Sequence, residues 1–318
     1  MNIGLVGYGM IAEHHVRAFR TLEDVRLRWL VGRRQGPTRS FAEQWGFPHH
    51  TLELEEALAD DFVDAVVITS PNALHARQAT TALQAGKHVL LELPIALTLN
   101  DAERLAELAQ RVDRKLMICH TMRFFPAFAH IRRLVDEGRF HMVQFVGHIL
   151  ISRRTNITAI GQPRSWTDNI LWHHGAHLVD LALWLGNCNH VQRVSYHHGP
   201  DYEQQGTMDM SLTMTLDNGS IATVSHSYFA PTLKQRNLVI GRENTFCWKD
   251  GTLYDFDDNV LMPEHSILDL TGQNTEFVAS VREDRAPLIT AETIMPTMRV
   301  IAEAQAIADA EKHHNRSN

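Results

Sequence analysis

Residues 1–20 read MNIGLVGYGMIAEHHVRAFR, and the architecture expected for the first half of the chain follows from these residues. The apolar run 3–6 predicts a strand, and residues 11–20 predict the helix that follows it. Between them lies a Gly-x-Gly-x-x-Ala pattern, whose glycines allow a tight turn while the start of the helix offers N–H groups to a pyrophosphate. The alternative is a glycine-rich turn without a ligand. Because of its place between strand and helix, the pattern predicts a dinucleotide site made by Gly7, Gly9, Met10 and Ile11.

The same alternation of strands and helices continues to about residue 120. Strands are expected at residues 25–31, 63–69, 87–91 and 115–119, and helices at residues 72–84 and 100–111. Strands that alternate with helices of this length predict a parallel sheet with helices on both faces. We therefore expect residues 1–120 to form a doubly wound Rossmann domain.

Beyond residue 120, strand patterns follow one another with few helices between them. They cover residues 142–152, 191–198, 208–216, 221–229 and 238–240, and Asp217-Asn218-Gly219 is a hairpin signal between two of them. Helices are expected at residues 169–185, 275–283 and 291–312. Residues 121–318 are thus expected to form an α+β domain on a large, mostly antiparallel open sheet, in a chain of the α/β class.

The end of the second expected strand indicates which dinucleotide is bound. A chain that binds NAD commonly carries Asp or Glu about twenty residues after the glycines, where it holds the ribose hydroxyls. Here the strand ends in Val31-Gly32-Arg33-Arg34, without an acid. Two arginines suit a 2′-phosphate. Arg33 and Arg34 therefore predict NADP, with NAD still possible; the alternative is that both are solvated loop charges.

Further cofactor contacts are expected where other strands of the first domain end, because open α/β sheets bind ligands at the carboxyl ends of their strands. Ser70-Pro71-Asn72 follows the third expected strand, and Glu92-Leu93-Pro94 follows the fourth. Pro94 indicates a fixed turn, in the trans form or the rarer cis form. The expected contacts are Ser70, Asn72, His75 and Glu92, together with Trp166 from the second domain.

The most unusual segment of the second half is RSWTDNILWHHGAHLVD at residues 164–180. On an α-helix, Leu171, Gly175, Leu178, Ala182 and Leu185 form an apolar stripe, and His173, His177, Asp180 and Trp184 form a second stripe. Three interpretations compete: imidazoles that take a hydroxyl proton, surface histidines without function, and a shared metal ion. No His-Glu-x-x-His pattern supports the metal. We predict His177 as the base, His173 beside it, Asp180 orienting an imidazole, His174 as a packed or orienting residue near the substrate, and no metal ion.

Arginines recur in the segments around these histidines. An arginine is most often a solvated charge, but guanidinium groups are also well suited to binding carboxylates. We therefore predict a small anionic substrate, bound by Arg123, Arg153, Arg154 and Arg164.

Composition and charge exclude several classes of protein. The 318 residues carry a formal net charge of −7, whereas a general nucleic-acid binder usually has a basic face. The three cysteines are too far apart in sequence for a disulfide framework or a CxxC zinc site. No apolar run approaches the roughly 18 residues of a membrane span, and no secretory signal pattern is present. We expect a cytoplasmic protein that binds neither membranes nor nucleic acids.

Taken together, these residues resemble the Gfo/Idh/MocA family of NAD(P)-dependent oxidoreductases over essentially the whole chain. The resemblance rests on the glycine pattern, on residues 92–94 where the family has Glu-Lys-Pro, and on the His-x-x-Asp of residues 177–180. It implies hydride transfer at a hydroxyl-bearing carbon and a homodimer or homotetramer. Two positions depart from the family pattern: Leu93 replaces the catalytic lysine, and His173 replaces the aspartate four residues before the catalytic histidine.

Both departures are shared with one branch of the family, which residues 161–168, 171–174 and 208–212 also resemble. That branch acts in protocatechuate 4,5-cleavage and oxidises the cyclic hemiacetal of a dicarboxylate, with NADP, to 2-pyrone-4,6-dicarboxylate. A hemiacetal hydroxyl is more acidic than a sugar alcohol, so a cationic lysine is less necessary. The resemblance implies this reaction here. The alternatives are a sugar or polyol dehydrogenase and a non-catalytic protein that senses NADP.

Overall fold

The computed structural model describes residues 1–153, 170–202 and 206–316. Contacts divide the chain into two units. The first contains Met1–Thr121 and Leu268–Met295, and the second contains Met122–Ile267 and Pro296–Asn318. Among the described residues, no helix combines the length and the apolar character that a membrane crossing requires.

The first unit is built on a six-stranded parallel sheet with the order β3-β2-β1-β4-β5-β6. Its strands are β1 (Asn2–Val6), β2 (Arg26–Val31), β3 (His49–Thr51), β4 (Ala65–Ile68), β5 (His88–Leu91) and β6 (Leu116–Ile118). Every residue of β4 is buried, as expected for a strand that is covered on both faces. The predicted doubly wound parallel sheet is confirmed, and the strand order reverses at β1, where the glycine turn begins.

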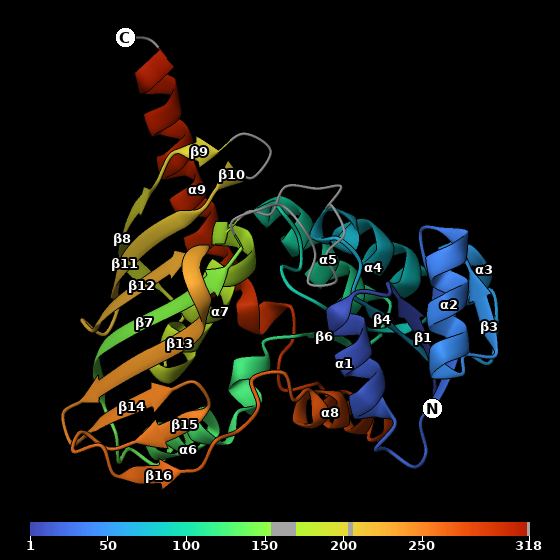
Figure 1. The fold of residues 1–318 in the computed structure, drawn as a ribbon, viewed down its shortest axis with the longest axis horizontal. Coiled ribbons are helices and arrows are strands. Elements are labelled where there is room, and N and C mark those ends of the chain that lie inside the picture. Colours follow the sequence, from blue (N-terminus) through green and yellow to red (C-terminus); the bar gives the residue numbers. More distant parts are fainter. Residues whose placement is uncertain (154–169, 203–205, 317–318) are drawn as a thin grey trace. The chain divides into compact units, whose positions relative to one another are not determined.

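Helices cover both faces of this sheet (Figure 1). On one face α1 (Met10–Phe19) packs against α8 (Thr271–Arg282), and on the other α4 (His75–Gln84) packs against α5 (Leu99–Arg111). The short helices η1 (Asn72–Leu74) and η4 (Glu292–Ile294) also belong to this unit. Helix α8 comes from the far end of the sequence, and no local pattern showed that it packs against α1.

Three elements of the first unit were not anticipated: β3, α2 (Gln35–Trp45) and α3 (Leu54–Leu58). Helix α2 begins with Gln35-Gly36-Pro37, which has the composition of a turn. Proline is nevertheless tolerated in the first turn of a helix, where its missing N–H has no intrahelical partner to lose. Strand β3 has only three residues, too few to show a periodicity.

The second unit is built on an eight-stranded sheet with the order β16-β15-β14-β13-β7-β12-β11-β8. Neighbouring strands are antiparallel except for β7 and β12, which run parallel, so the predicted mostly antiparallel sheet is confirmed. The strands are β7 (Met142–Ser152), β8 (Val191–His198), β11 (Asp209–Leu216), β12 (Ile221–Ser227), β13 (Phe229–Gly241), β14 (Thr245–Lys249), β15 (Thr252–Tyr254) and β16 (Val260–Met262). A separate two-stranded ribbon joins β9 (Asp201–Tyr202) to β10 (Gly206–Thr207).

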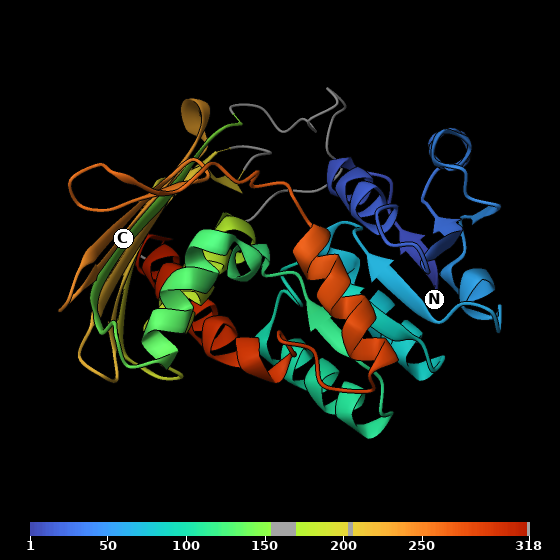
Figure 2. The same cartoon turned by 90° about the horizontal axis from the view of Figure 1, so that it is seen from below.

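Helices α6 (Pro126–Asp136), α7 (Ala176–Leu185) and α9 (Met295–Arg316) lie against one face of this sheet (Figure 2). The short helix η2 (Thr121–Phe124) precedes α6. The buried side chains of β7 and β12, among them Phe145, Ile149 and Val224, alternate with half-exposed ones. This alternation is typical of a sheet that is covered on one face only.

The segment that carries the histidines differs from the expected single α-helix. A π-helical turn, η3 (Leu171–Gly175), precedes α7. The predicted apolar stripe is buried as expected, but Asp180, which was assigned to the polar stripe, is also buried. A π turn holds more residues than an α-helical turn, so the α-helical spacing used to place His173 on the stripe of His177 does not hold across it.

Candidate active site

The glycine turn of the first unit has the geometry of a phosphate-binding site. Gly7 has φ +113°, and a Cβ added there would lie 2.5 Å from Thr69 Oγ1. A Cβ added at Gly9, the N-cap residue of α1, would meet no atom of the described chain within 4 Å, and no described side chain caps that helix. The N–H groups at the start of α1, which Met10 and Ile11 begin, are therefore open to an anion. The turn fits the pyrophosphate of a dinucleotide.

The two arginines lie next to this turn. The Gly7 N–H donates to the carbonyl oxygen of Val31, the last residue of β2, at 2.9 Å. Arg33 and Arg34 follow directly, and both are exposed. Arg34 precedes α2, and its carbonyl oxygen accepts hydrogen bonds from the N–H and hydroxyl of Thr38 at 3.0 and 2.7 Å. The turn that carries the guanidinium groups is thus fixed while the side chains face solvent.

The other cofactor contacts predicted in this unit lie on the two segments that follow β4 and β5. The bond between Leu93 and Pro94 is cis, the rarer of the two forms considered. His75 is buried, and its two ring nitrogens lie 2.8 Å from the carbonyl oxygens of Pro94 and Ser70. Asn72 is the first residue of η1, the short helix that ends directly before His75. His75 therefore joins the two loops whose residues were predicted to contact the cofactor.

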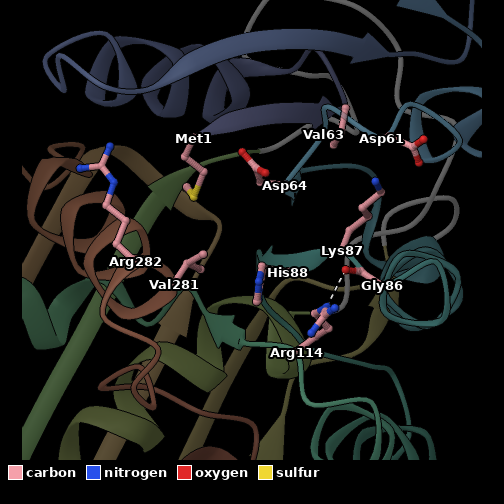
Figure 3. Close-up of a pocket in the computed structure, with 10 residues that line it drawn as sticks. All are labelled: Met1, Asp61, Val63, Asp64, Gly86, Lys87, His88, Arg114, Val281 and Arg282. Atoms are coloured by element: carbon pink, nitrogen blue, oxygen red, sulfur yellow. Dashed lines mark hydrogen bonds between the residues drawn. The ribbon is translucent and has the colours of Figure 1, made fainter.

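A cavity of about 510 Å³ lies at the opposite edge of the same sheet (Figure 3). Met1, Asp64 and His88 line it at the amino ends of the strands, and Arg114 donates to the Gly86 carbonyl oxygen at 2.6 Å beside it. Ligands of open α/β sheets bind at the carboxyl ends of strands. This cavity is therefore distinct from the glycine turn and from the dinucleotide site.

The second unit gathers four imidazoles around η3 and the adjacent strands. The rings of His173 and His174 are stacked with centroids 4.1 Å apart. The ring of His174 lies 6.4 Å from that of His177 and 6.5 Å from that of His226 on β12. His226 was not among the site residues predicted from the sequence. Its signal was the alternation in β12, which places it on the same buried face as Ala222 and Val224.

Burial keeps part of this cluster uncharged at neutral pH. Desolvation, followed by the charges of His173, Arg153, His177 and His226, holds the pKa of His174 well below its ordinary value. Desolvation also lowers the pKa of His226 to about 3, with smaller contributions from His177, His148 and His173. His174 and His226 are therefore neutral imidazoles at pH 7.

Tyr228 and Arg153 adjoin the histidine cluster. The Tyr228 hydroxyl lies 2.6 Å from Nδ1 of His174. The Arg153 guanidinium lies 4.8 Å from the centre of the Tyr228 ring, and its Nη1 donates to the hydroxyl at 3.4 Å. Tyr228 was not anticipated, because it follows β12 in a segment without a motif. Arg153 is thus held beside the cluster, whereas Arg154, Arg164 and Trp166 lie outside the described residues.

Asp180 and Arg123 form a buried ion pair. The Arg123 Nε and Nη2 donate to the two carboxylate oxygens of Asp180 at 2.8 and 2.6 Å, and the Thr297 hydroxyl donates to Oδ1 at 3.2 Å. The Arg123 side chain is 11% exposed and that of Asp180 is 2% exposed. The substrate-binding role predicted for Arg123 therefore competes with its pairing to Asp180.

The fold and the glycine turn define a dinucleotide-binding protein, and comparison with known proteins gives its family. Residues 1–120 match the family described as "Oxidoreductase family, NAD-binding Rossmann fold", and residues 126–262 match "Bacterial oxidoreductases, C-terminal". The chain belongs to the Gfo/Idh/MocA family of oxidoreductases, so its Rossmann unit is an NAD-binding fold and the protein is a dehydrogenase of that family.

Two relatives align with nearly the full length of the chain. The 4-carboxy-2-hydroxymuconate-6-semialdehyde dehydrogenase of Sphingobium sp. (strain NBRC 103272 / SYK-6) is 31% identical over 96% of this chain and 98% of its own. The scyllo-inositol 2-dehydrogenase (NADP(+)) IolU of Bacillus subtilis (strain 168) is 30% identical over 96% of both chains. Among solved structures, GenD2 from gentamicin A biosynthesis in complex with NAD has a TM-score of 0.81 and 23% identity, covering 96% of this chain and 92% of that chain, which supports the fold.

Proposed function

We propose that this protein uses NADP to oxidise the cyclic hemiacetal of 4-carboxy-2-hydroxymuconate-6-semialdehyde to 2-pyrone-4,6-dicarboxylate. The observation that carries the proposal is the histidine cluster. It places neutral imidazoles beside the cationic Arg153. Such a site combines a proton acceptor with a group that attracts a carboxylate. The near full-length similarity to a dehydrogenase named for this substrate supports the same reaction.

NADP is the cofactor that the first unit fits best. The start of α1 and the glycine turn would hold the pyrophosphate, and the exposed Arg33 and Arg34 would hold the 2′-phosphate. Ser70, Asn72, His75 and Glu92 lie on the loops at the carboxyl edge where the rest of the dinucleotide would bind. When bound, the cofactor supplies the nicotinamide that accepts the hydride.

His177 is the proposed base that takes the hydroxyl proton. It lies in the first turn of α7, and the ring of its neighbour His174 is uncharged at neutral pH and close to the Tyr228 hydroxyl. His173, whose ring stacks on that of His174, would share or orient the hydroxyl of the substrate. Asp180 acts, in this proposal, through the Arg123 pair that fixes α7.

Leu93 supports a hemiacetal substrate over a sugar alcohol. It occupies the position at which the family resemblance places a catalytic lysine, and it is 5% exposed. A buried leucine offers no positive charge to a developing alkoxide. The more acidic hydroxyl of a hemiacetal needs less stabilisation of that kind, and the lactone product favours oxidation.

Absorbance in the reduced-nicotinamide band tests the proposal. NADP or NAD is added to enzyme mixed with protocatechuate that a 4,5-dioxygenase has freshly opened. We expect a rise that is at least about ten times faster with NADP, as one lost charge-assisted phosphate contact would predict. No rise with either cofactor, in protein that binds NADP, would overturn the assignment of substrate.

A polyol substrate is the second candidate, because the relative IolU is named for scyllo-inositol and NADP(+). The same assay with scyllo-inositol and myo-inositol separates the two. Turnover of an inositol with kcat/KM above that for the ring-opened product would replace the pyrone-forming reaction by inositol oxidation.

A further inference from the structure

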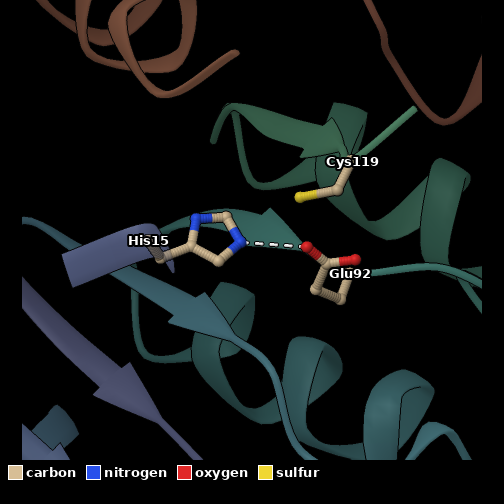
Figure 4. A group of neighbouring side chains, drawn as sticks. All are labelled: His15, Glu92 and Cys119. Carbon is tan, nitrogen blue, oxygen red and sulfur yellow. Dashed lines mark hydrogen bonds and ion pairs between the residues drawn. The ribbon is translucent and has the colours of Figure 1, made fainter. Parts of the chain in front are cut away.

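Three side chains from separate elements of the first unit converge on one point (Figure 4). They are His15 from α1, Glu92 after β5 and Cys119 after β6. One ligand atom of each, an imidazole nitrogen, a carboxylate oxygen and a thiol sulfur, lies within 4.8 Å of the other two. Among the described residues, no other group of three or more His, Cys, Asp and Glu side chains has this geometry.

We infer that His15, Glu92 and Cys119 form a binding site for a thiophilic divalent cation such as Zn²⁺. Nitrogen, oxygen and sulfur donors are the three kinds of ligand that zinc takes in proteins. Ligands of one tetrahedral zinc lie about 3–4 Å apart, as follows from bond lengths of roughly 2.0–2.3 Å. Small side-chain rotations would bring the three atoms from their present separation to that distance.

The hydrogen bond on the far side of the His15 ring selects the nitrogen that a metal needs. Nδ1 lies 3.0 Å from Oδ1 of Asn274 on α8, and Nε2 lies 2.9 Å from Oε1 of Glu92. The Asn274 amide is oriented because its Nδ2 donates to the His15 carbonyl oxygen at 3.4 Å. His15 therefore donates from Nδ1 to Asn274 and presents Nε2 to the site. Metal-binding histidines commonly have such an oxygen partner on the other ring nitrogen.

Charge also favours a divalent ion at this place. His15 and Cys119 are fully buried, and the Glu92 side chain is 15% exposed. A neutral imidazole, a carboxylate and a thiolate together balance the two positive charges of Zn²⁺, so the loaded site carries no net charge in the interior. The thiol proton and the proton that His15 Nε2 and Glu92 share across their 2.9 Å contact leave to solvent on binding, and the partly exposed Glu92 gives the ion its path inward. A water can take the fourth position.

Cobalt binding to the full-length, reduced protein tests this inference. Co²⁺ bound by a thiolate in a tetrahedral site gives a sulfur-to-metal charge-transfer band, which reports the cysteine directly and needs no turnover. We expect one Co²⁺ per chain with this band, displaced by Zn²⁺. Cys119→Ser should abolish the band, and Glu92→Gln should weaken binding by at least about 10–100-fold, the loss that removal of a mere hydrogen-bond partner of a metal ligand already causes.

Cys247→Ser is the matched control, because Cys247 is a half-buried thiol on β14 of the second unit. It should leave both the band and its stoichiometry unchanged. The inference is overturned if wild type shows no band, if Cys119→Ser retains it, or if Cys247→Ser removes it. Circular dichroism melting of each variant shows that it is folded, and the Glu92→Gln affinity tests the same site without altering a cysteine.

Discussion

His177 is the residue on which the proposed chemistry depends most. If it takes the hydroxyl proton, His177→Asn should lower kcat by about 100-fold or more, the usual contribution of a general base, while the KM for NADP changes little because the residues proposed to bind the cofactor phosphates lie in the first unit. Steady-state kinetics with the ring-opened substrate measures both quantities. His197→Asn, at an exposed position on β8, is the control and should keep wild-type kinetics. A fall in kcat of only a few-fold would show that His177 is not the base and that the assignment belongs to another histidine.

Arg33 and Arg34 should decide between the two dinucleotides. Replacing both with alanine removes the positive charge that we propose binds the 2′-phosphate, so the KM for NADP should rise about 10–100-fold while the KM for NAD stays within a few-fold. Arg39→Ala is the control, since the Arg39 Nε donates to Glu43 on its own helix at 2.7 Å. An equal rise in KM for NADP and NAD would show that the two arginines do not bind the 2′-phosphate.

Single residues also show where prediction from sequence ends. Gly7, Arg33, Ser70 and Glu92 could be placed at one sheet edge because parallel strands end together there. Cys119 and His15 could not be connected to Glu92, because each comes from a different element and no spacing links them. His226 and Tyr228 joined the histidine cluster only through the packing of β12 and the residue after it against η3 and α7, a contact between distant parts of the sequence.

At the scale of elements, the Arg123–Asp180 pair fixes α7 to η2. Arg123→Met leaves the buried Asp180 carboxylate without its main partner, which should lower the free energy of unfolding by about 3–5 kcal/mol. Adding Asp180→Asn to this variant removes the buried charge and should restore part of the loss. Urea unfolding followed by circular dichroism measures all three proteins.

An exposed ion pair supplies the comparison. Arg139→Met removes the pair with Glu137, whose side chains are 67% and 42% exposed, and should cost about 0–1 kcal/mol. If Arg123→Met lowers the free energy of unfolding by no more than Arg139→Met does, the buried pair does not hold α7 in place.

Elements were predictable where their pattern was local. The long strand 142–152 has its expected bounds, and the five strands predicted in the first unit all form, because each contains adjacent apolar residues that the sheet buries. Short or atypical elements failed for a physical reason. Helix α2 starts with glycine and proline, and the π turn η3 depends on tertiary packing that a 3.6-residue period does not encode.

At the scale of the whole molecule, the buried histidines should make folding sensitive to acid. An unfolded histidine has a pKa near 6.5, whereas burial lowers the pKa of folded His226 to about 3. Below pH 6.5, His226 therefore binds a proton in the unfolded chain but not in the folded chain, so the free energy of unfolding falls as the pH falls. His226 alone should contribute a loss of roughly 2 kcal/mol between pH 7 and pH 5, at about 1.4 kcal/mol per pH unit. The lowered pKa of His174 adds a loss of the same sign.

His226→Leu isolates this contribution. Neither ring nitrogen of His226 has a hydrogen-bond partner among the described residues, so an apolar side chain of similar size leaves no new unpaired polar group. We expect the free energy of unfolding of this variant, measured in urea at pH 7, 6 and 5, to fall less steeply than that of wild type. Between pH 7 and pH 5, the free energy of unfolding of the variant should fall by roughly 2 kcal/mol less than that of wild type. His197→Gln, at an exposed position, should keep the wild-type slope, because carboxylate titrations are common to all three proteins. Parallel curves for wild type and His226→Leu would mean that His226 titrates in the folded protein as it does in the unfolded chain, and that the cluster is open enough to water to carry charge at neutral pH.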